Sequence, residues 1–289
     1  MPQIVNQGIH EPHGSPTRRR GSPLTTWLCS NCIVRTPDDP SSQGPSAANS
    51  ERPDRMTLEH YLAVRASETG NSSIPLSNAL RPLMGPATRL RAKQLATTAL
   101  APYTRRRARA LQGVKPLRLH LGSGGNNLDG WVNVDLVGAN ADLSWDLRRP
   151  LPFAAASVET VFLEHVLEHL TIADGVRMLH LFLPLMMPEG IIRVGVPDAG
   201  LYATSYVRED SVIDDLRPGR PTRMLALGEV FQEHGHLSAW DSETLCLALS
   251  EAGYQEATPM PGGSSKISPV PDSADRIPET VYAEAIAPD

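Results

Sequence analysis

The sequence has 289 residues, of which 40% are apolar and only 5% aromatic, and a formal net charge of −5. Its longest nearly apolar stretch, Met178–Met187, is far shorter than the ~20 residues of a membrane span. Residues 1–14 have no apolar signal-peptide core, and three cysteines do not make a disulfide framework, so we expect a cytoplasmic chain without membrane spans.

The charge is unevenly distributed along the chain. Residues 1–115 carry 16 Lys+Arg and 7 Asp+Glu, whereas residues 116–289 carry 11 and 25. The basic runs Arg18–Arg20 and Arg105–Arg107 have no interleaved aromatic residues and belong to no RNA-binding motif. We interpret them as solvated, and they do not support a nucleic acid as partner.

Residues 1–55 are predicted to be a disordered arm. They contain eight Pro, seven Ser and four Gly, with no apolar periodicity, and bury too little apolar surface to offset the entropy of ordering. Cys29 and Cys32 form a lone C-x-x-C pair there. A structural zinc needs two further ligands at suitable spacing, so we interpret these cysteines as incidental.

Residues 56–115 are predicted to be a basic, irregular helical region. The segment 56–68 has apolar residues near one helical face, and the next helical pattern is interrupted by Pro82, Pro86 and Pro102.

From residue 116 to 289 the pattern is that of an α/β domain. Helices are expected at 171–187 and 241–252, the second with Asp241 as N-cap and Gly253 as its stop. Strands are expected at residues 117–121, 131–135, 141–146, 158–163, 191–196, 255–260 and 280–286. Strands that alternate with helices favour a mostly parallel sheet.

The ends of the first three strands carry residues that suit a nucleoside. Bare backbone at Gly122–Gly125 lets a ligand approach closely. Asp135, which ends the second strand, can accept both hydroxyls of a ribose, and Asp146 can face an adenine amine. Parallel strands of open α/β sheets bind ligands at their carboxyl ends, so these residues predict a nucleoside pocket.

These motifs resemble those of a known family. LHLGSGGNNLDGWVNVDL, DLRRPLPFAAASVETVFLEHVLEHL and MPEGIIRVGVPD are similar, in this order, to the class I S-adenosylmethionine-dependent methyltransferases, nearest to the methyltransferase-11-like "GWxNVD" branch. The resemblance covers about residues 117–286. It implies a Rossmann-like seven-stranded, mostly parallel sheet with a late antiparallel hairpin, and S-adenosylmethionine as cofactor.

The resemblance also implies roles for single residues. Gly122, Ser123 and Gly124 would cradle the methionine part of the cofactor, and Asp135 would hold the ribose. Asp146 and Leu147 would border the adenine, and Glu164 and His165 would lie near the methyl donor. His120 stands where the family usually has an acid.

A non-catalytic or degenerate nucleoside-binding module is the alternative function. The usual G-x-G-x-G reads G-S-G-G-N here, with Asn126 in the last place. The interval from Gly122 to Asp135 is short, so a helix between the first two strands has one or two turns at most.

A zinc hydrolase is a third possibility. His165-Val166-Leu167-Glu168-His169 matches the inverted zinc-protease motif H-x-x-E-H. The candidate third ligands are Glu164, Glu229, Glu233, His234 and His236. The motif follows an apolar strand at once and does not lie inside a long helix, which favours the methyltransferase interpretation.

The acceptor of a methyl group is not encoded in a recognisable motif. Glu164-His165-Val166-Leu167 stands where a base-methylating enzyme would have an Asn-Pro-Pro-Tyr-like motif, so a small molecule or a glycan is favoured. His165, His120 and His236 are candidate bases for a hydroxyl acceptor, and nothing in the sequence selects among them. The segment 234–236 either lines the acceptor pocket or forms a polar loop.

Overall fold

The fold is seen in a computed structural model, which describes residues 55–68, 86–112, 116–137 and 140–289. The chain divides into residues 1–50 and 51–289, and the description below concerns the second unit. The predicted arm, with Cys29, Cys32 and Arg18–Arg20, lies outside the described residues apart from Arg55.

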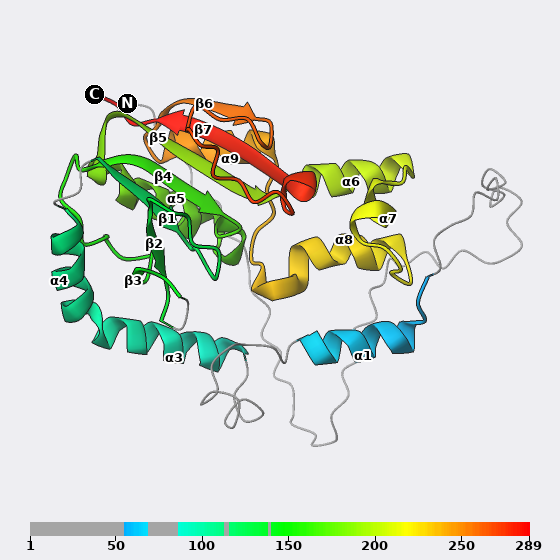
Figure 1. The fold of residues 1–289 in the computed structure, drawn as a ribbon. Helices are drawn as coiled ribbons and strands as arrows, with labels where there is room; N and C mark the ends of the chain where they lie inside the picture. Colours follow the sequence, from blue (N-terminus) through cyan, green and yellow to red (C-terminus); the bar gives the residue numbers. More distant parts are fainter. Residues whose placement is uncertain (1–54, 69–85, 113–115, 138–139) are drawn as a thin grey trace, which may run out of the picture. The chain divides into compact units, whose positions relative to one another are not determined.

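A seven-stranded sheet forms the centre of the described unit (Figure 1). Its strands are β1 (Leu117–Leu121), β2 (Val132–Asp135), β3 (Leu143–Ser144), β4 (Val158–Glu164), β5 (Met186–Pro197), β6 (Gln255–Met260) and β7 (Thr280–Ile286). Their order is β3-β2-β1-β4-β5-β7-β6; the first five are parallel, and β7 runs antiparallel to β5 and β6. The Rossmann-like sheet with a late antiparallel hairpin is therefore confirmed.

Eight α-helices are described around this sheet. They are α1 (Leu58–Glu68), α3 (Pro86–Ala99), α4 (Ala101–Leu111), α5 (Ile172–Phe182), α6 (Ala199–Arg208), α7 (Val212–Leu216), α8 (Arg223–Gln232) and α9 (Ser242–Glu251). In the described ranges no helix combines the length and apolar character needed to cross a bilayer.

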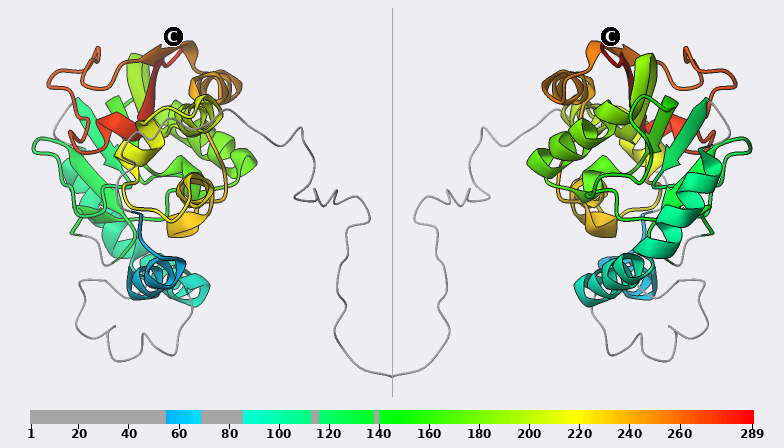
Figure 2. Two further views of the ribbon diagram at one scale, coloured as in Figure 1. Left: turned by 90° about the vertical axis from the view of Figure 1, so that its right-hand side faces the viewer. Right: turned by 90° about the vertical axis from the view of Figure 1, so that its left-hand side faces the viewer.

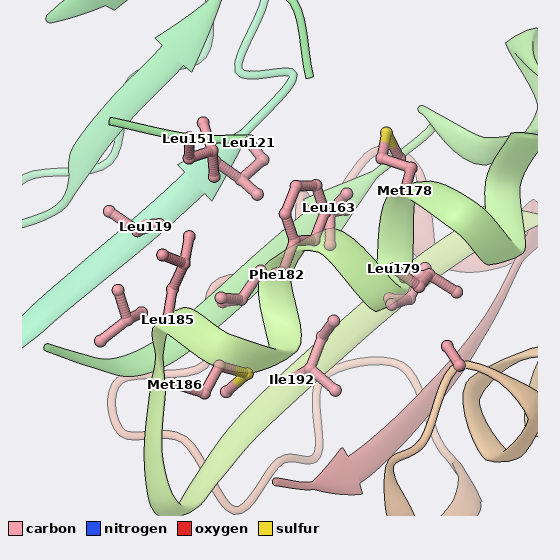
Figure 3. Close-up of a cluster of buried hydrophobic side chains, with 14 of the residues drawn as sticks. Leu119, Leu121, Leu151, Leu163, Met178, Leu179, Phe182, Leu185, Met186 and Ile192 are labelled. Carbon is pink, nitrogen blue, oxygen red and sulfur yellow. The ribbon is translucent and has the colours of Figure 1, made fainter. Parts of the chain in front are cut away.

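One face of the sheet carries the main core. Leu119 and Leu121 of β1 and Leu163 of β4 are fully buried on this face, against Leu179 and Phe182 of α5 (Figure 3). Their alternation with polar residues along β1 is the signal that predicted the strand. Helices α4 and α9 bury residues in the same core, so this face is covered by helices.

The helix predicted at 171–187 ends earlier than expected. α5 stops at Phe182, a short 3-10 turn follows, and Met186 already pairs with Val158 in the sheet. The register between β4 and β5 then shifts, with Glu189 at φ +59° inside the bulge. An apolar run such as 181–187 fits a buried helix or a buried strand equally well. Here its last residues begin a strand because Met186 pairs with Val158 of β4.

The opposite face of the sheet is covered differently near β1 and β2. Residues 122–131, all described, form a loop with no helix between these two strands. In place of a helix, the long connection between β6 and β7 covers this part of the sheet, and its Ile267 is buried against Phe162 and Trp131. That connection is fastened to the sheet by Arg193 of β5, whose guanidinium makes two 2.6 Å hydrogen bonds to the carboxylate of Asp272.

Helices α6, α7 and α8 were not predicted from the sequence. They follow the carboxyl end of β5 and pack on one another around Tyr202, Ile213 and Val230 (Figures 1 and 2). Local caps start two of them, since Asp198 accepts a hydrogen bond from Leu201 N and Thr222 accepts one from Leu225 N.

Candidate functional site

The candidate site begins at the turn that follows β1. Gly122 has φ +73°, and a Cβ on it would lie 2.3 Å from Cγ2 of Val166, so only glycine fits this position. The backbone N–H groups of Gly122 and Ser123 donate to the carbonyl of Val134 in β2, at 2.8 and 3.3 Å. The turn is thus fixed between β2 and the segment that follows β4.

Asp135 ends β2 and faces this turn. One of its carboxylate oxygens accepts the N–H of Gly124 at 2.7 Å, and the other accepts the N–H of Leu136. Its side chain is half-buried, and a carboxylate has about four lone-pair positions, so acceptor capacity remains for a ligand.

The turn has the features of a cradle for a polar ligand. Ser123 is 4% exposed, and within the described chain its hydroxyl oxygen has no hydrogen-bond partner. A Cβ placed on Gly124 or Gly125 would meet no described atom within 4 Å. An unpartnered buried hydroxyl, free backbone surface and an acid with spare lone pairs together fit a nucleoside-type group.

His120 lies behind the turn and is nearly buried. Its Nδ1 is 3.1 Å from Oδ1 of Asn133, which also accepts the N–H of Leu128 at 2.8 Å. An amide oxygen only accepts, so Nδ1 of His120 carries the proton. Burial lowers the pKa of His120, and the neutral ring packs against Phe162 at a centroid distance of 5.2 Å.

Asp146 and Leu147 follow β3, next to β2 in the sheet. The guanidinium of Arg148 binds both carboxylate oxygens of Asp146, at 3.0 and 2.7 Å. Burial alone would raise the pKa of Asp146, but the hydrogen bonds from Arg148 lower it overall. Asp146 is therefore an anion whose charge is already matched within the chain.

Glu164 ends β4 and is turned toward β7. Its Oε1 accepts hydrogen bonds from the hydroxyl of Tyr282 at 2.7 Å and from the N–H of Ser273 at 3.1 Å. Burial, followed by the hydrogen bond to Glu164, raises the pKa of Tyr282, so the phenol stays a donor. Glu164 thus joins the end of β4 to the connection between β6 and β7.

His165 turns the chain sharply out of β4, with φ +56°. Its Nε2 is 2.8 Å from Oγ1 of Thr280, and its Nδ1 is 3.7 Å from Oε1 of Glu168. Burial, with a smaller contribution from the charge of Arg276, lowers the pKa of His165 to about 3. The imidazole is neutral at physiological pH.

The sequence His165–His169 does not form the helix that an inverted zinc-protease site requires. After the turn at His165, only Leu167–His169 is helical, as one 3-10 turn. Burial raises the pKa of Glu168 to about 8, so this acid holds its proton near neutral pH. His169 and Glu168 do approach His236, one of the candidate third ligands.

The predicted site residues thus lie at the carboxyl ends of four neighbouring strands, β3, β2, β1 and β4. Direct contacts join Gly124 to Asp135, and the Gly122 position to the segment after β4. Sequence reasoning missed Asn133, whose amide organises the back of the turn through His120 and Leu128. Its place in the middle of a strand, where a polar residue is buried, was the available signal.

Comparisons with known proteins give similarity in structure alone. No protein-family model matches the sequence. Nor does the sequence match any curated protein.

Several solved structures that are similar to this chain are methyltransferases. Human N-acetylserotonin methyltransferase, in complex with S-adenosylmethionine, is 17% identical over 80% of this chain and 66% of its own, with a TM-score of 0.40. An S-adenosylmethionine-dependent methyltransferase of Archaeoglobus fulgidus is 16% identical over 67% and 94%, with a TM-score of 0.39. A 16S rRNA adenine methyltransferase of Catenulisporales acidiphilia is 12% identical over 64% and 92%, with a TM-score of 0.37.

Proposed function

We propose that this chain binds S-adenosylmethionine and transfers its methyl group to an acceptor, as the GWxNVD-type resemblance implies. The observation that carries the proposal is the cradle at the carboxyl ends of β1 and β2. There the glycine turn, the unpartnered Ser123 hydroxyl and the Asp135 carboxylate meet on a Rossmann-like sheet.

In this proposal each predicted residue has a limited role. Asp135 accepts the ribose hydroxyls, while the backbone of Gly122–Gly124 and the Ser123 hydroxyl hold the amino-acid part. Leu147 borders the adenine with Asp146, which stays paired with Arg148. His120 supports the turn from behind.

The proposed chemistry needs alignment more than activation. The bound cofactor supplies a methyl group on a sulfonium, which is already a good leaving group. The residues of the chain hold donor and acceptor in line and exclude water. Such alignment can account for a large part of the rate enhancement over the uncatalysed reaction. Glu164 and His165, at the end of β4, border the place where the acceptor would stand, and burial keeps the imidazole of His165 neutral there.

The proposal also covers the class of acceptor and the roles of the three segments of the chain. A small molecule or a glycan is favoured over a nucleic acid. We assign the transfer to residues 116–289 and treat 1–55 and 56–115 as an arm and a basic helical region, in a cytoplasmic protein.

A nucleoside-binding module without catalysis is the second candidate. It is motivated by the altered glycine motif, G-S-G-G-N in place of G-x-G-x-G, and by the 122–131 loop, which contains no helix after the glycine turn. Binding of S-adenosylmethionine without methyl transfer to any acceptor class would support this module.

Titration of the full chain with S-adenosylmethionine and S-adenosylhomocysteine, followed by thermal unfolding, tests the proposal. A ligand at 100 times its Kd stabilises the folded state by about 2.7 kcal/mol. Both nucleosides should raise the melting temperature. No shift with either one up to millimolar concentration would contradict binding and both candidate functions.

Asp135→Ala should weaken S-adenosylmethionine binding about tenfold or more, because charged hydrogen bonds contribute about 1.5–3 kcal/mol each. Asp129→Ala is the matched control, since Asp129 is an exposed acid in the same loop. Isothermal titration calorimetry measures both affinities. Equal affinity in the two variants would mean that the ribose is held elsewhere.

A further inference from the structure

Three side chains that the proposed cradle does not use converge beside it. Glu168 and His169 belong to the 3-10 turn after β4, and His236 comes from the segment after α8. One potential ligand atom from each of the three residues lies within 4.8 Å of the other two. Two imidazoles and a carboxylate at such separations are a donor set that binds divalent cations.

Glu168 is the feature that calls for a ligand. It is 1% exposed, and neither carboxylate oxygen is hydrogen-bonded to another residue in the described ranges. Buried carboxylates are normally paired, hydrogen-bonded or bound to a metal, because burying the bare group is costly. The charge of Arg276 acts on Glu168, but this guanidinium lies 3.9 Å from the carboxylate of Glu164 and is partnered there.

The hydrogen bonds of His236 leave one of its nitrogens available to a cation. Its Nδ1 is 2.7 Å from the carbonyl oxygen of Val230. A carbonyl only accepts, so Nδ1 carries the proton and Nε2 has the free lone pair. A backbone carbonyl behind the second nitrogen is the usual arrangement around histidines that bind metals.

His165 presents a second free lone pair to the same carboxylate. The hydroxyl of Thr280 donates to the carbonyl of Arg276 at 2.7 Å, so it must accept from Nε2 of His165. This leaves Nδ1 unprotonated, 3.7 Å from Oε1 of Glu168. Neither atom can donate a hydrogen bond to the other when Glu168 is ionised, so the side chain of His165 does not satisfy this carboxylate.

The backbone holds these residues in place without a ligand. The carbonyl of Glu168 accepts the N–H of Leu237 at 2.7 Å, which fixes the segment of His236 against the 3-10 turn. The Ser238 hydroxyl donates to the carbonyl of Leu167 and accepts from the indole of the buried Trp240. A site built on such contacts is preorganised, which favours binding.

We propose that Glu168, His169 and His236 bind a divalent first-row transition cation such as Zn²⁺. Two nitrogen ligands favour Zn²⁺ over Mg²⁺, which takes oxygen ligands and keeps its waters. The side chain of His169 is exposed, so the site has a route to solvent. This ligand set differs from the inverted zinc-protease motif, in which Glu168 would be a base and both histidines of one helix would bind the metal.

Three protein ligands leave a coordination position open for water or a substrate oxygen. If the proposed function holds, on which this step rests, a cation held by Glu168 and His169 would lie next to the 3-10 turn that follows β4, near the expected place of the acceptor. The cation would then select acceptors that offer an oxygen, such as a hydroxyl of a small molecule or glycan, and hold that oxygen near the methyl donor.

The test measures Zn²⁺ binding to the untagged full chain after dialysis against a chelator, by calorimetry and by elemental analysis of the desalted protein. The expected result is one Zn²⁺ per chain, not displaced by excess Mg²⁺. Glu168→Gln and His236→Gln should each weaken binding at least ~10–100-fold, the loss known for residues that merely support a ligand. His234→Gln is the control, since His234 is an exposed neighbour outside the three-residue cluster.

Glu168→Gln removes a buried acid and keeps its shape, so the metal-free variant should melt no lower than the wild type. Absence of Zn²⁺ binding, or equal binding in wild type and both cluster variants, would overturn the proposed site. Affinity for S-adenosylmethionine is measured on the same samples. A chain that binds Zn²⁺ but neither nucleoside would refute the proposed function and leave the cation site supported.

Discussion

Replacing Arg193 with methionine should lower the free energy of unfolding by about 3–5 kcal/mol, the range found when one partner of a buried ion pair is removed. The guanidinium is 0% exposed and is held by Asp272 and by Glu284, the latter at 2.8 Å. Its loss leaves two buried carboxylates without a cation. The melting temperature should fall by about 6–20 °C, at about 2–4 °C per kcal/mol for a unit of this size.

Chemical denaturation with urea measures this change, and Arg177→Met is the matched control. Arg177 pairs with Asp174 on the surface of α5, where both side chains are largely exposed, 69% and 43%. Such a pair contributes about 0.2–1 kcal/mol. If the two variants lose the same stability, Arg193 does not fasten the connection between β6 and β7 in the way its contacts indicate.

Gly122→Ala should cost about 2–5 kcal/mol of unfolding free energy and weaken binding of S-adenosylmethionine. The positive φ alone costs an L-residue about 1–2 kcal/mol, and overpacking adds about 1–3 kcal/mol. The new methyl group would lie 2.3 Å from Cγ2 of Val166, a β-branched side chain with little rotational freedom.

Gly125→Ala is the control for this prediction, because a Cβ there meets no described atom within 4 Å and the backbone has no positive φ. Gly125→Ala should change the free energy of unfolding by no more than about 0.5 kcal/mol. The double variant Gly122→Ala/Val166→Ala removes the clash and keeps the strained φ, so a double-mutant cycle separates the two causes. A Gly122→Ala protein as stable as Gly125→Ala would show that the turn is not held against Val166.

Much of the sheet could be predicted from the sequence because its strands have clear alternation and clear ends. The bounds of β1, β6 and β7 match the expected residues, and the turn at Gly122 follows β1 directly. Helices α6, α7 and α8 could not be predicted, because their apolar faces are short and many of their packing contacts are polar. Glu229 of α8, for example, is 4% exposed and is held by Arg220 from outside the helix.

The candidate site was predictable where it depends on the end of a strand. Asp135 could be placed because it follows β2 directly, and its contact with Gly124 follows from parallel strands ending at one edge. His236 was one of five candidate partners for the segment of Glu168, and the sequence could not select it, because their meeting depends on how the α6–α8 segment returns to the sheet. The pairing of Asp146 with Arg148 was equally open, since nothing in the sequence decides which side chains pair locally.

The position of β7 between β5 and β6 also bears on how the protein is made. β6 is paired with β7 alone. Arg193 of β5 forms both of its ion pairs only after Asp272 and Glu284 have been synthesised and have folded against it. On the ribosome, one edge of β5 therefore stays unpaired until residues 280–286 have emerged. Until then Arg193, which is buried in the finished fold, also lacks its partner Glu284. Such long-range pairing is slow and leaves apolar strand edges open to aggregation, so this half of the sheet is where synthesis would depend most on chaperones.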